Sequence, residues 1–183
     1  MKSFKIYLVG ESDSGKSSIL SVLQNKPFNY NIAQTIGVDY CRYKRKQFIF
    51  EIYDTSGLAQ FQQSTVNSMK NANLIILCFD ISSKEAFQHI EKWLNIIQKS
   101  TKVIPIVLVG NKIDKSLQKK NEQIKGLIQN YILHYTSALN PKSVKDMFTN
   151  IFQDIINSDE NLNKTLIRPQ KQDQKENKWF CFC

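Results

Sequence analysis

The sequence predicts an α/β domain with a mostly parallel, six-stranded sheet that helices cover on both faces. Two observations support this prediction. Short segments rich in β-branched and aromatic residues alternate along the chain with segments whose apolar residues recur at helical spacing. The strand-like segments are also continuous apolar runs, which are typical of strands buried on both faces of a parallel sheet. In such a sheet, ligands bind at the carboxyl ends of the strands.

The order of the expected elements follows from the spacing of apolar residues and turn residues. Strands are expected at residues 4–9, 38–44, 47–53, 74–80, 104–110 and 132–135. Only Arg45 and Lys46 separate the second strand from the third, which predicts a tight antiparallel hairpin. Helices are expected between Lys16 and Pro27, after a Ser83 cap, over about residues 122–129, and after a Ser143 cap.

Length and composition predict one compact domain at residues 1–157, followed by a flexible polar tail at residues 158–183. A chain of 183 residues, of which 42% are apolar, can bury an ordinary hydrophobic core. Its longest apolar runs, residues 74–79 and 104–109, are far shorter than the roughly 20 residues that span a bilayer. With no signal-peptide core at its start, the chain is expected in the cytosol.

The formal net charge of +9 raises the question of nucleic-acid binding. The basic residues are scattered, however, and the tight run consists of Arg42, Lys44, Arg45 and Lys46. We interpret this run as a solvated hairpin, with attraction to anionic lipid as the alternative. No nucleic-acid partner is expected.

A candidate phosphate-binding loop follows the first strand. Residues 10–17 read Gly-Glu-Ser-Asp-Ser-Gly-Lys-Ser and fit the pattern Gly-x-x-x-x-Gly-Lys-Ser/Thr between a strand and a helix. In this pattern the backbone N–H groups cradle the phosphates, Lys16 neutralises the outer pair, and the Ser17 hydroxyl can ligate Mg²⁺. The residues predicted to line the phosphates are Asp13, Ser14, Gly15, Lys16, Ser17 and Ser18.

Two further segments at strand ends predict guanine as the base. Asn111, Lys112 and Asp114 directly follow the fifth strand. The Asp114 carboxylate can accept both N–H groups on the guanine edge, and it would repel the acceptor atoms that adenine places there. Ser137 and Ala138, after the last strand, would supply a backbone N–H to the guanine carbonyl oxygen. This base preference opposes the alternative of an adenine-specific P-loop kinase.

Together with Asp-Thr-Ser-Gly at residues 54–57, these motifs in this order resemble the signature of the Ras superfamily of small GTPases. The resemblance covers about residues 4–157. Thr-Ile-Gly-Val-Asp-Tyr at residues 35–40 is similar to the first switch of the Rab family, and residues 77–82 are similar to another Rab segment. The resemblance implies the P-loop NTPase small-GTPase fold and a GTP/GDP-dependent switch in vesicle trafficking.

The resemblance also implies roles for individual residues. Thr35 would join Ser17 on Mg²⁺, and Asp54 would hold the metal through a water. Phe28 would lie against the guanine. The residues implied in catalysis are Lys16, Thr35 and Gly57. Because Thr35 and the Gly57 N–H would both contact the γ-phosphate, loss of that phosphate would relax the flanking loops.

Two residues depart from the family's pattern. The family usually has Gln directly after Gly57, where it orients the attacking water, but Leu58 occupies that position here. Intrinsic hydrolysis is therefore expected to be slow unless Gln60 swings in. The alternative function is a nearly permanently GTP-bound membrane scaffold. Asp13 stands where a small neutral residue is usual, and it would either weaken phosphate binding by repulsion or point harmlessly to solvent.

The four cysteines fall into two classes. Cys41 and Cys78 lie in strand-like runs and are expected in the core or at the sheet edge. Cys181 and Cys183 resemble the Cys-x-Cys ending of Rab proteins, in which both thiols take geranylgeranyl groups. This ending implies a lipid anchor on the cytoplasmic face of an intracellular membrane, with a cytosolic pool. The implied partners of this monomeric protein are an exchange factor, an activating protein, an escort protein or dissociation inhibitor, and effectors.

Overall fold

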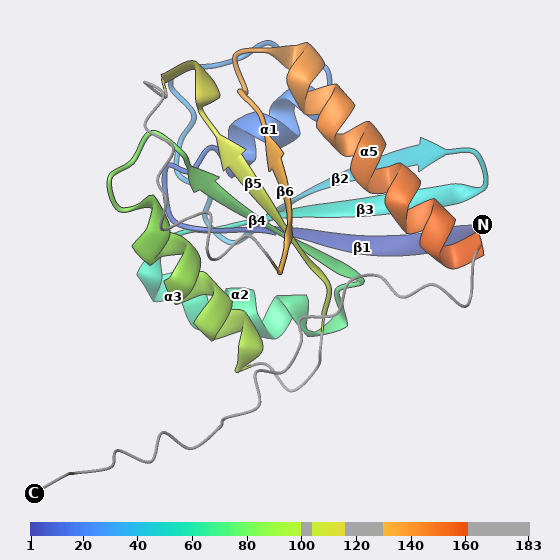
Figure 1. Cartoon of the computed structure of the whole chain (residues 1–183), viewed down its shortest axis with the longest axis horizontal. Coiled ribbons are helices and arrows are strands. Elements are labelled where there is room, and N and C mark those ends of the chain that lie inside the picture. Colours follow the sequence, from blue (N-terminus) through green and yellow to red (C-terminus); the bar gives the residue numbers. More distant parts are fainter. Residues whose placement is uncertain (100–103, 116–129, 161–183) are drawn as a thin grey trace, which may run out of the picture.

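The computed structural model describes residues 1–99, 104–115 and 130–160 of the chain. Within these residues, one sheet contains six strands in the order β2-β3-β1-β4-β5-β6 (Figure 1). β2 runs antiparallel to β3, and all the other neighbours are parallel. The strands are β1 (Lys2–Val9), β2 (Val38–Arg45), β3 (Phe48–Thr55), β4 (Leu74–Asp80), β5 (Ile106–Asn111) and β6 (Ile132–Tyr135). The prediction of a mostly parallel, six-stranded sheet is confirmed.

Helices cover both faces of this sheet. Figure 1 shows α1 (Lys16–Leu23) and α5 (Pro141–Glu160) on one face, and α2 (Gln62–Ser68) and α3 (Ala86–Gln98) on the other. Three short 3₁₀ helices complete the described part: η1 (Ala59–Phe61), η2 (Met69–Asn71) and η3 (Ile113–Lys115). The helix expected over residues 122–129 lies outside the described residues. Of the described helices, none combines the length and the apolar character needed to cross a membrane.

The strand β1 divides the core between the two faces. Its side chains alternate, so Ile6 and Leu8 pack under α1 and α5, while Tyr7 and Val9 pack under α3. Trp93, at the centre of the apolar face of α3, is 2% exposed. Both faces of the sheet are therefore buried under helices, which explains why the sequences of the central strands are continuous apolar runs. Cys41 and Cys78 are both buried, as predicted.

Several element boundaries differ from the sequence-based expectation, namely those of β1, β3 and β5, the hairpin loop, and the starts of α3 and α5. Arg45 still pairs with Phe48, so the two-residue hairpin loop is Lys46–Gln47 rather than Arg45–Lys46, and Lys46 adopts φ +53° in the turn. The helix expected after Ser83 begins at Ala86. The Ser83 hydroxyl accepts the Glu85 N–H (3.2 Å) within the preceding turn and therefore does not cap the helix.

The cap of α5 is Asn140 and not Ser143. The Asn140 Oδ1 accepts the N–H groups of Lys142 (3.1 Å) and Ser143 (3.3 Å), and Pro141 occupies the first helical position, where its missing N–H costs nothing. Because the helix starts three residues earlier than expected, the Ser143 hydroxyl does not cap it and contacts Thr136 and Ser137 in the loop after β6. The helix α2 was not predicted from the sequence, because its polar segment buries only Thr65 and shows no apolar periodicity.

The stacking of α5 on the sheet predicts a large loss of stability on truncation of Phe152. Its ring lies 4.1 Å, centroid to centroid, from the Phe50 ring of β3, and both are essentially inaccessible to solvent. Phe152→Ala leaves a cavity, so we expect the free energy of unfolding in urea to fall by about 3–5 kcal/mol. The exposed neighbour Asn150 on the same helix is the control, and Asn150→Ala should change it by less than about 0.5 kcal/mol. Equal losses in the two variants would contradict this packing.

Candidate functional site

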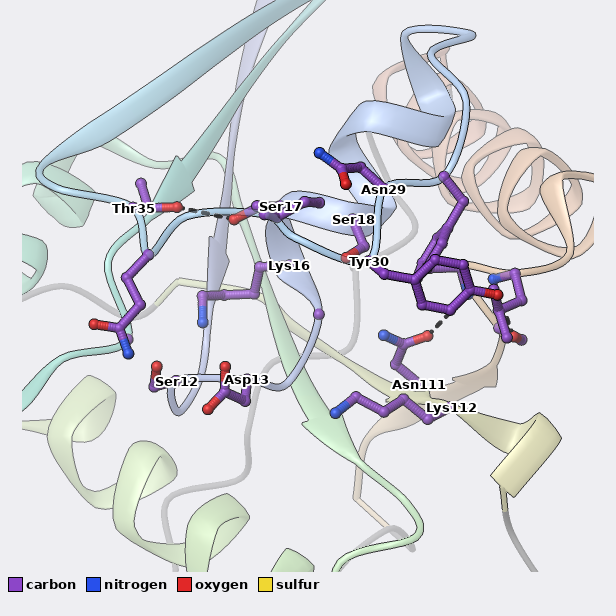
Figure 2. Close-up of a pocket in the computed structure, with 18 of the residues that line it drawn as sticks. Ser12, Asp13, Lys16, Ser17, Ser18, Asn29, Tyr30, Thr35, Asn111 and Lys112 are labelled. Atoms are coloured by element: carbon purple, nitrogen blue, oxygen red, sulfur yellow. Dashed lines mark hydrogen bonds between the residues drawn. The ribbon is translucent and has the colours of Figure 1, made fainter.

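A cavity of about 370 Å³ opens at the carboxyl ends of the strands, where ligands of such sheets bind. Its wall comes from five segments that are separate in sequence: the loop after β1 with the start of α1, residues 28–35, the end of β3, the loop after β5 and the loop after β6. Figure 2 shows these segments converging, with Lys16 and Ser17 between Thr35 on one side and Ser12 and Asp13 on the other.

The loop at residues 10–17 wraps around the Lys16 side chain. The ammonium group donates to the carbonyl oxygens of Gly10 (2.9 Å) and Glu11 (2.7 Å) and to the Ser14 hydroxyl (3.3 Å). Lys16 is 5% exposed, and burial lowers the pKa of its ammonium group. A buried cation held by backbone carbonyls at the mouth of a cavity is electrostatically suited to an anionic ligand.

Three oxygen-bearing side chains meet beside this loop. The Ser17 hydroxyl lies 2.9 Å from the Thr35 hydroxyl (Figure 2). The Ser17 hydroxyl also donates to Asp54 Oδ2 (2.6 Å), and the Thr35 hydroxyl contacts the same carboxylate oxygen at 3.2 Å. The other carboxylate oxygen, Asp54 Oδ1, is buried and has no hydrogen-bond partner among the residues that the structure describes. Burial raises the pKa of Asp54, because removal from water disfavours the charged carboxylate. A positive charge nearby would favour the charged form. Two hydroxyls and an unsatisfied carboxylate form a donor set that suits Mg²⁺.

The opposite end of the cavity is built from the loops after β5 and β6. Asn111 donates from Nδ2 to the Ser14 carbonyl (2.9 Å) and accepts the Ala138 N–H at Oδ1 (3.2 Å). The Ser137 hydroxyl donates to the Asp114 carboxylate, and the Ser137 N–H donates to the Ser143 hydroxyl (3.2 Å). These contacts hold Asp114 and the Ala138 backbone at one edge of the cavity.

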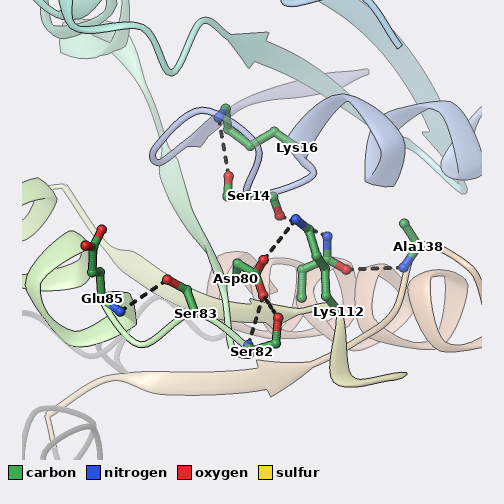
Figure 3. A network of polar contacts seen from close by, with 9 residues as sticks. Ser14, Lys16, Asp80, Ser82, Ser83, Glu85, Lys112 and Ala138 are labelled. Carbon is green, nitrogen blue, oxygen red and sulfur yellow. Dashed lines mark hydrogen bonds and ion pairs between the residues drawn. The ribbon is translucent and has the colours of Figure 1, made fainter. Parts of the chain in front are cut away.

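Lys112 is anchored separately. Its ammonium group pairs with Asp80 Oδ2 at 2.9 Å, and Figure 3 shows this pair beside the phosphate loop. Burial alone would raise the pKa of Asp80, but hydrogen bonds from Ser82 and Lys112 outweigh it, so the pKa lies below its usual value. The carboxylate therefore stays charged near neutral pH and holds the stem of Lys112 at the cavity wall.

The segment after β3 reaches the cavity at a single point. Of residues 57–71, all of which the structure describes, Gly57 alone lines the wall. A Cβ at Gly57 would lie 2.4 Å from the Ser12 nitrogen, so the close approach of the two loops requires glycine. Leu58 is half-buried outside the wall, and Gln60 is exposed on η1.

The structure brings the predicted nucleotide-site residues together. The wall of the cavity contains Asp13, Gly15, Lys16, Ser17, Ser18, Phe28, Thr35, Gly57, Asn111, Lys112, Asp114, Ser137 and Ala138. Ser14 and Asp54 do not line it, but they contact it through Asn111 and through Ser17 and Thr35. Cys181 and Cys183 lie outside the described residues. Sequence reasoning missed several wall residues, among them Ser12, Asn29, Tyr30, Ile32, Gln34 and Leu139, which carry no motif of their own.

Comparison with known proteins agrees with this geometry. A family model described as the Ras family matches residues 5–157. The chain belongs to the Ras family. It is 31% identical over 161 residues to the Ras-related protein RabQ of Dictyostelium discoideum, covering 83% of this chain and 79% of that protein. It is 32% identical over 200 residues to the Ras-related protein Rab-18 of Lymnaea stagnalis, covering 99% and 95%.

A plant relative shows a similar likeness. The Ras-related protein RABA6b of Arabidopsis thaliana is 34% identical over 154 residues, covering 79% of this chain and 67% of that protein. Membership of the Ras family implies a small GTPase switch that hydrolyses GTP, typically with Mg²⁺, and that works with regulatory partners. The oxygens of Ser17, Thr35 and Asp54 fit that metal by chemistry and by the unpartnered Asp54 Oδ1.

The link between the phosphate loop and Asn111 predicts that Gly15 is needed for stability. Gly15 adopts φ +85°, and an added Cβ would lie 2.2 Å from Asn111 Nδ2. Gly37 adopts φ +86° with no atom within 4 Å of an added Cβ, so Gly37→Ala isolates the backbone strain. We expect Gly15→Ala to lower the free energy of unfolding by about 1–3 kcal/mol more than Gly37→Ala, measured in urea without nucleotide. Equal losses would show that the contact with Asn111 contributes little.

Proposed function

We propose that this chain is a Rab-like, GTP/GDP-dependent switch that is anchored to the cytoplasmic face of an intracellular membrane, acts in vesicle trafficking and hydrolyses GTP slowly. The observation that carries the proposal is that three features lie around one cavity. They are the phosphate loop, the oxygens suited to Mg²⁺, and the Asp114 carboxylate that could bind a guanine base. A nucleoside triphosphate with guanine as its base has the chemistry to match all three.

The phosphates would lie on the loop at residues 10–17. Lys16 is already held at its mouth and would exchange part of its carbonyl contacts for phosphate oxygens, while Gly15 and Ser18 offer backbone N–H groups at the start of α1. Ser17 and Thr35 would ligate Mg²⁺ directly and Asp54 through a water. Bound there, the metal would neutralise charge on the phosphate oxygens. Asp13 is exposed and lines this part of the cavity, so a carboxylate that faces the phosphates would weaken their binding by repulsion.

The guanine would be read by Asp114 and by the backbone of Ser137 and Ala138. The Ser137 hydroxyl, which donates to Asp114, would orient that carboxylate toward the two N–H groups of the base edge. Lys112 and Phe28 line the same end of the cavity and would flank the base. Because Asn111 joins this end to Ser14, binding of the base and of the phosphates would stabilise the same set of loops.

The switch itself would depend on Thr35 and Gly57. Thr35 is only half-buried and precedes a run of exposed residues, whereas Gly57 touches the phosphate loop directly. Both would contact the γ-phosphate, so its release would remove one contact from each loop and change the surface that effectors recognise. An exchange factor, an activating protein and an escort protein or dissociation inhibitor would control this cycle for a monomeric chain.

Slow hydrolysis is proposed because Leu58 follows Gly57. An apolar side chain cannot donate a hydrogen bond to the attacking water or accept one from it. The second candidate function, a nearly permanently GTP-bound membrane scaffold, is favoured by the same residue. Turnover of GTP with and without an activating protein distinguishes the two. The membrane anchor is proposed from Cys181 and Cys183, which would carry two prenyl groups.

Base specificity predicts the effect of Asp114→Asn. The variant replaces one of the two acceptor oxygens with an NH₂ donor that opposes a guanine N–H group, so we expect GTP affinity to fall by about 10²-fold or more and preference to move toward xanthine nucleotides. Competition binding with GTP, XTP and ATP on the purified variant measures both effects. An Asp114→Asn protein that binds GTP as tightly as the parent would mean that another group reads the base.

The anchor predicts the effect of the double variant Cys181→Ser, Cys183→Ser. Since a single prenyl chain gives only marginal attachment, we expect each single variant to bind membranes weakly and the double variant to be fully soluble in cell fractionation. Finding the double variant on membranes would show that a contact other than the prenyl groups holds it there.

The proposed cause of slow turnover predicts the effect of Leu58→Gln. The variant restores a carboxamide without touching the phosphate loop, the oxygen cluster or the base edge. We expect single-turnover hydrolysis to rise about tenfold or more from a parent rate at or below the order of 10⁻⁴ s⁻¹ that is typical of intrinsic small-GTPase hydrolysis. We also expect the parent protein to purify largely with GTP. An unchanged rate in the variant would show that Leu58 does not limit the chemistry.

A further inference from the structure

The phosphate end of the cavity lacks a carboxamide from the loop after β3. Leu58 occupies the position where the family has its glutamine, and Gln60 is the nearest glutamine after it. Neither residue lines the cavity wall. Gln60 is exposed on η1 (Ala59–Phe61), and none of the three residues of η1 is buried. If the bound nucleotide is hydrolysed in this cavity, another polar group must position the water.

Gln34 stands where such a group is needed. It lines the cavity and directly precedes Thr35, whose hydroxyl lies 2.9 Å from that of Ser17 and 3.2 Å from Asp54. Figure 2 shows Thr35 facing Ser12 and Asp13 across the cavity, with Lys16 between them. Gln34 therefore lines the cavity next to the residue that would contact the outermost phosphate.

The other two carboxamides in the wall are already committed or distant. Asn111 donates to the Ser14 carbonyl and accepts the Ala138 N–H, so both ends of its side chain are used. Asn29 accepts the Asn31 N–H (2.9 Å) and lies beside Tyr30, at the far end of the loop from Thr35 (Figure 2). Gln34, by contrast, is exposed, and its side chain makes no hydrogen bond within the described residues.

We propose that Gln34, from the loop before β2, orients the attacking water in place of the glutamine that is missing at position 58. The inference rests on the proposed GTP hydrolysis. The carboxamide oxygen accepts a hydrogen bond from the water, and its NH₂ group donates to a γ-phosphate oxygen. The water oxygen bonds to the γ-phosphorus as the bond from that phosphorus to the β–γ bridging oxygen breaks. The electron pair leaves with GDP, and the water protons pass to the released phosphate and to solvent.

The same geometry predicts that the reaction is slow. The Gln34 side chain is exposed and unrestrained, so it must lose conformational freedom each time it positions the water. A donor that is not held in place contributes less than the 10²–10³-fold that preorganised donors typically provide. The contribution of Gln34 is therefore about tenfold.

Single-turnover hydrolysis by the full chain, loaded with GTP and Mg²⁺, tests the proposal. Gln34→Ala should lower the rate about tenfold. Gln60→Ala, which removes the same side chain from an exposed site outside the cavity, should leave it within about twofold of the parent rate. GDP dissociation should be the same in both variants, because neither residue holds the nucleotide. Leu58→Gln should restore turnover in the Gln34→Ala background, since it supplies the lost carboxamide from the other loop.

Three outcomes would overturn the proposal. They are an unchanged rate in Gln34→Ala, a slower rate in Gln60→Ala instead, and a parent with no measurable turnover. A slow Gln34→Ala variant that also loses nucleotide faster, and that Leu58→Gln does not rescue, would assign Gln34 a structural role and would also overturn it. A chain that fails to bind GTP would instead contradict the proposed function itself, and a binding measurement made first separates the two failures.

Discussion

The organisation of the site depends on the Asn111 side chain. Its Nδ2 donates to the carbonyl of Ser14 in the phosphate loop, and its Oδ1 accepts the Ala138 N–H in the loop after β6. A buried carboxamide with both ends satisfied is stable, whereas losing either partner would leave a polar atom without a hydrogen bond. Asn111 is the last residue of β5, so its side chain joins the loops after β1 and β6 to this strand at the carboxyl ends of the sheet. The cavity keeps its shape through this contact.

A second constraint is the buried carboxylate of Asp54. It is 1% exposed, and one of its oxygens has no hydrogen-bond partner, which is costly in the absence of a cation. Ser17, from α1, and Thr35, from the loop before β2, share its other oxygen. Positive charge at this point would therefore stabilise α1 and the loop before β2 together. This coupling gives a physical basis for a loop whose order depends on what the cavity holds.

The hydrophobic core packs the sheet and its helices much more tightly than the segment at residues 28–37. α1 and α5 pack on one face through aromatic rings such as Phe50 and Phe152, and α3 packs on the other around Trp93. The segment from residue 28 to residue 37, in contrast, has no helix or strand and is mostly exposed. Few buried contacts mean a low local stability, so this segment can change conformation without disturbing the sheet.

The sequence by itself determined the fold class, the order of the strands along the chain and nearly all of the cavity-wall residues that belong to a sequence motif. These features depend on local patterns: continuous apolar runs for the buried strands, and Gly-x-x-x-x-Gly-Lys-Ser and Asn-Lys-x-Asp at strand ends. Helix boundaries were less predictable. Asn140 caps α5 and Pro141 is its first residue, so the helix begins before Ser143. The polar helix α2 has no apolar repeat and could not be predicted from periodicity.

Only the tertiary structure decided which residues without a motif belong to the site. Gln34 and Leu58 are both single residues next to motif residues, yet Gln34 lines the cavity and Leu58 does not. No local pattern encodes this difference, since it depends on how the loops before β2 and after β3 meet the phosphate loop. The unpartnered oxygen of Asp54 and the double role of Asn111 are likewise contacts between segments far apart in sequence. Such contacts depend on the packing of the whole sheet, which brings the strand ends within hydrogen-bond distance.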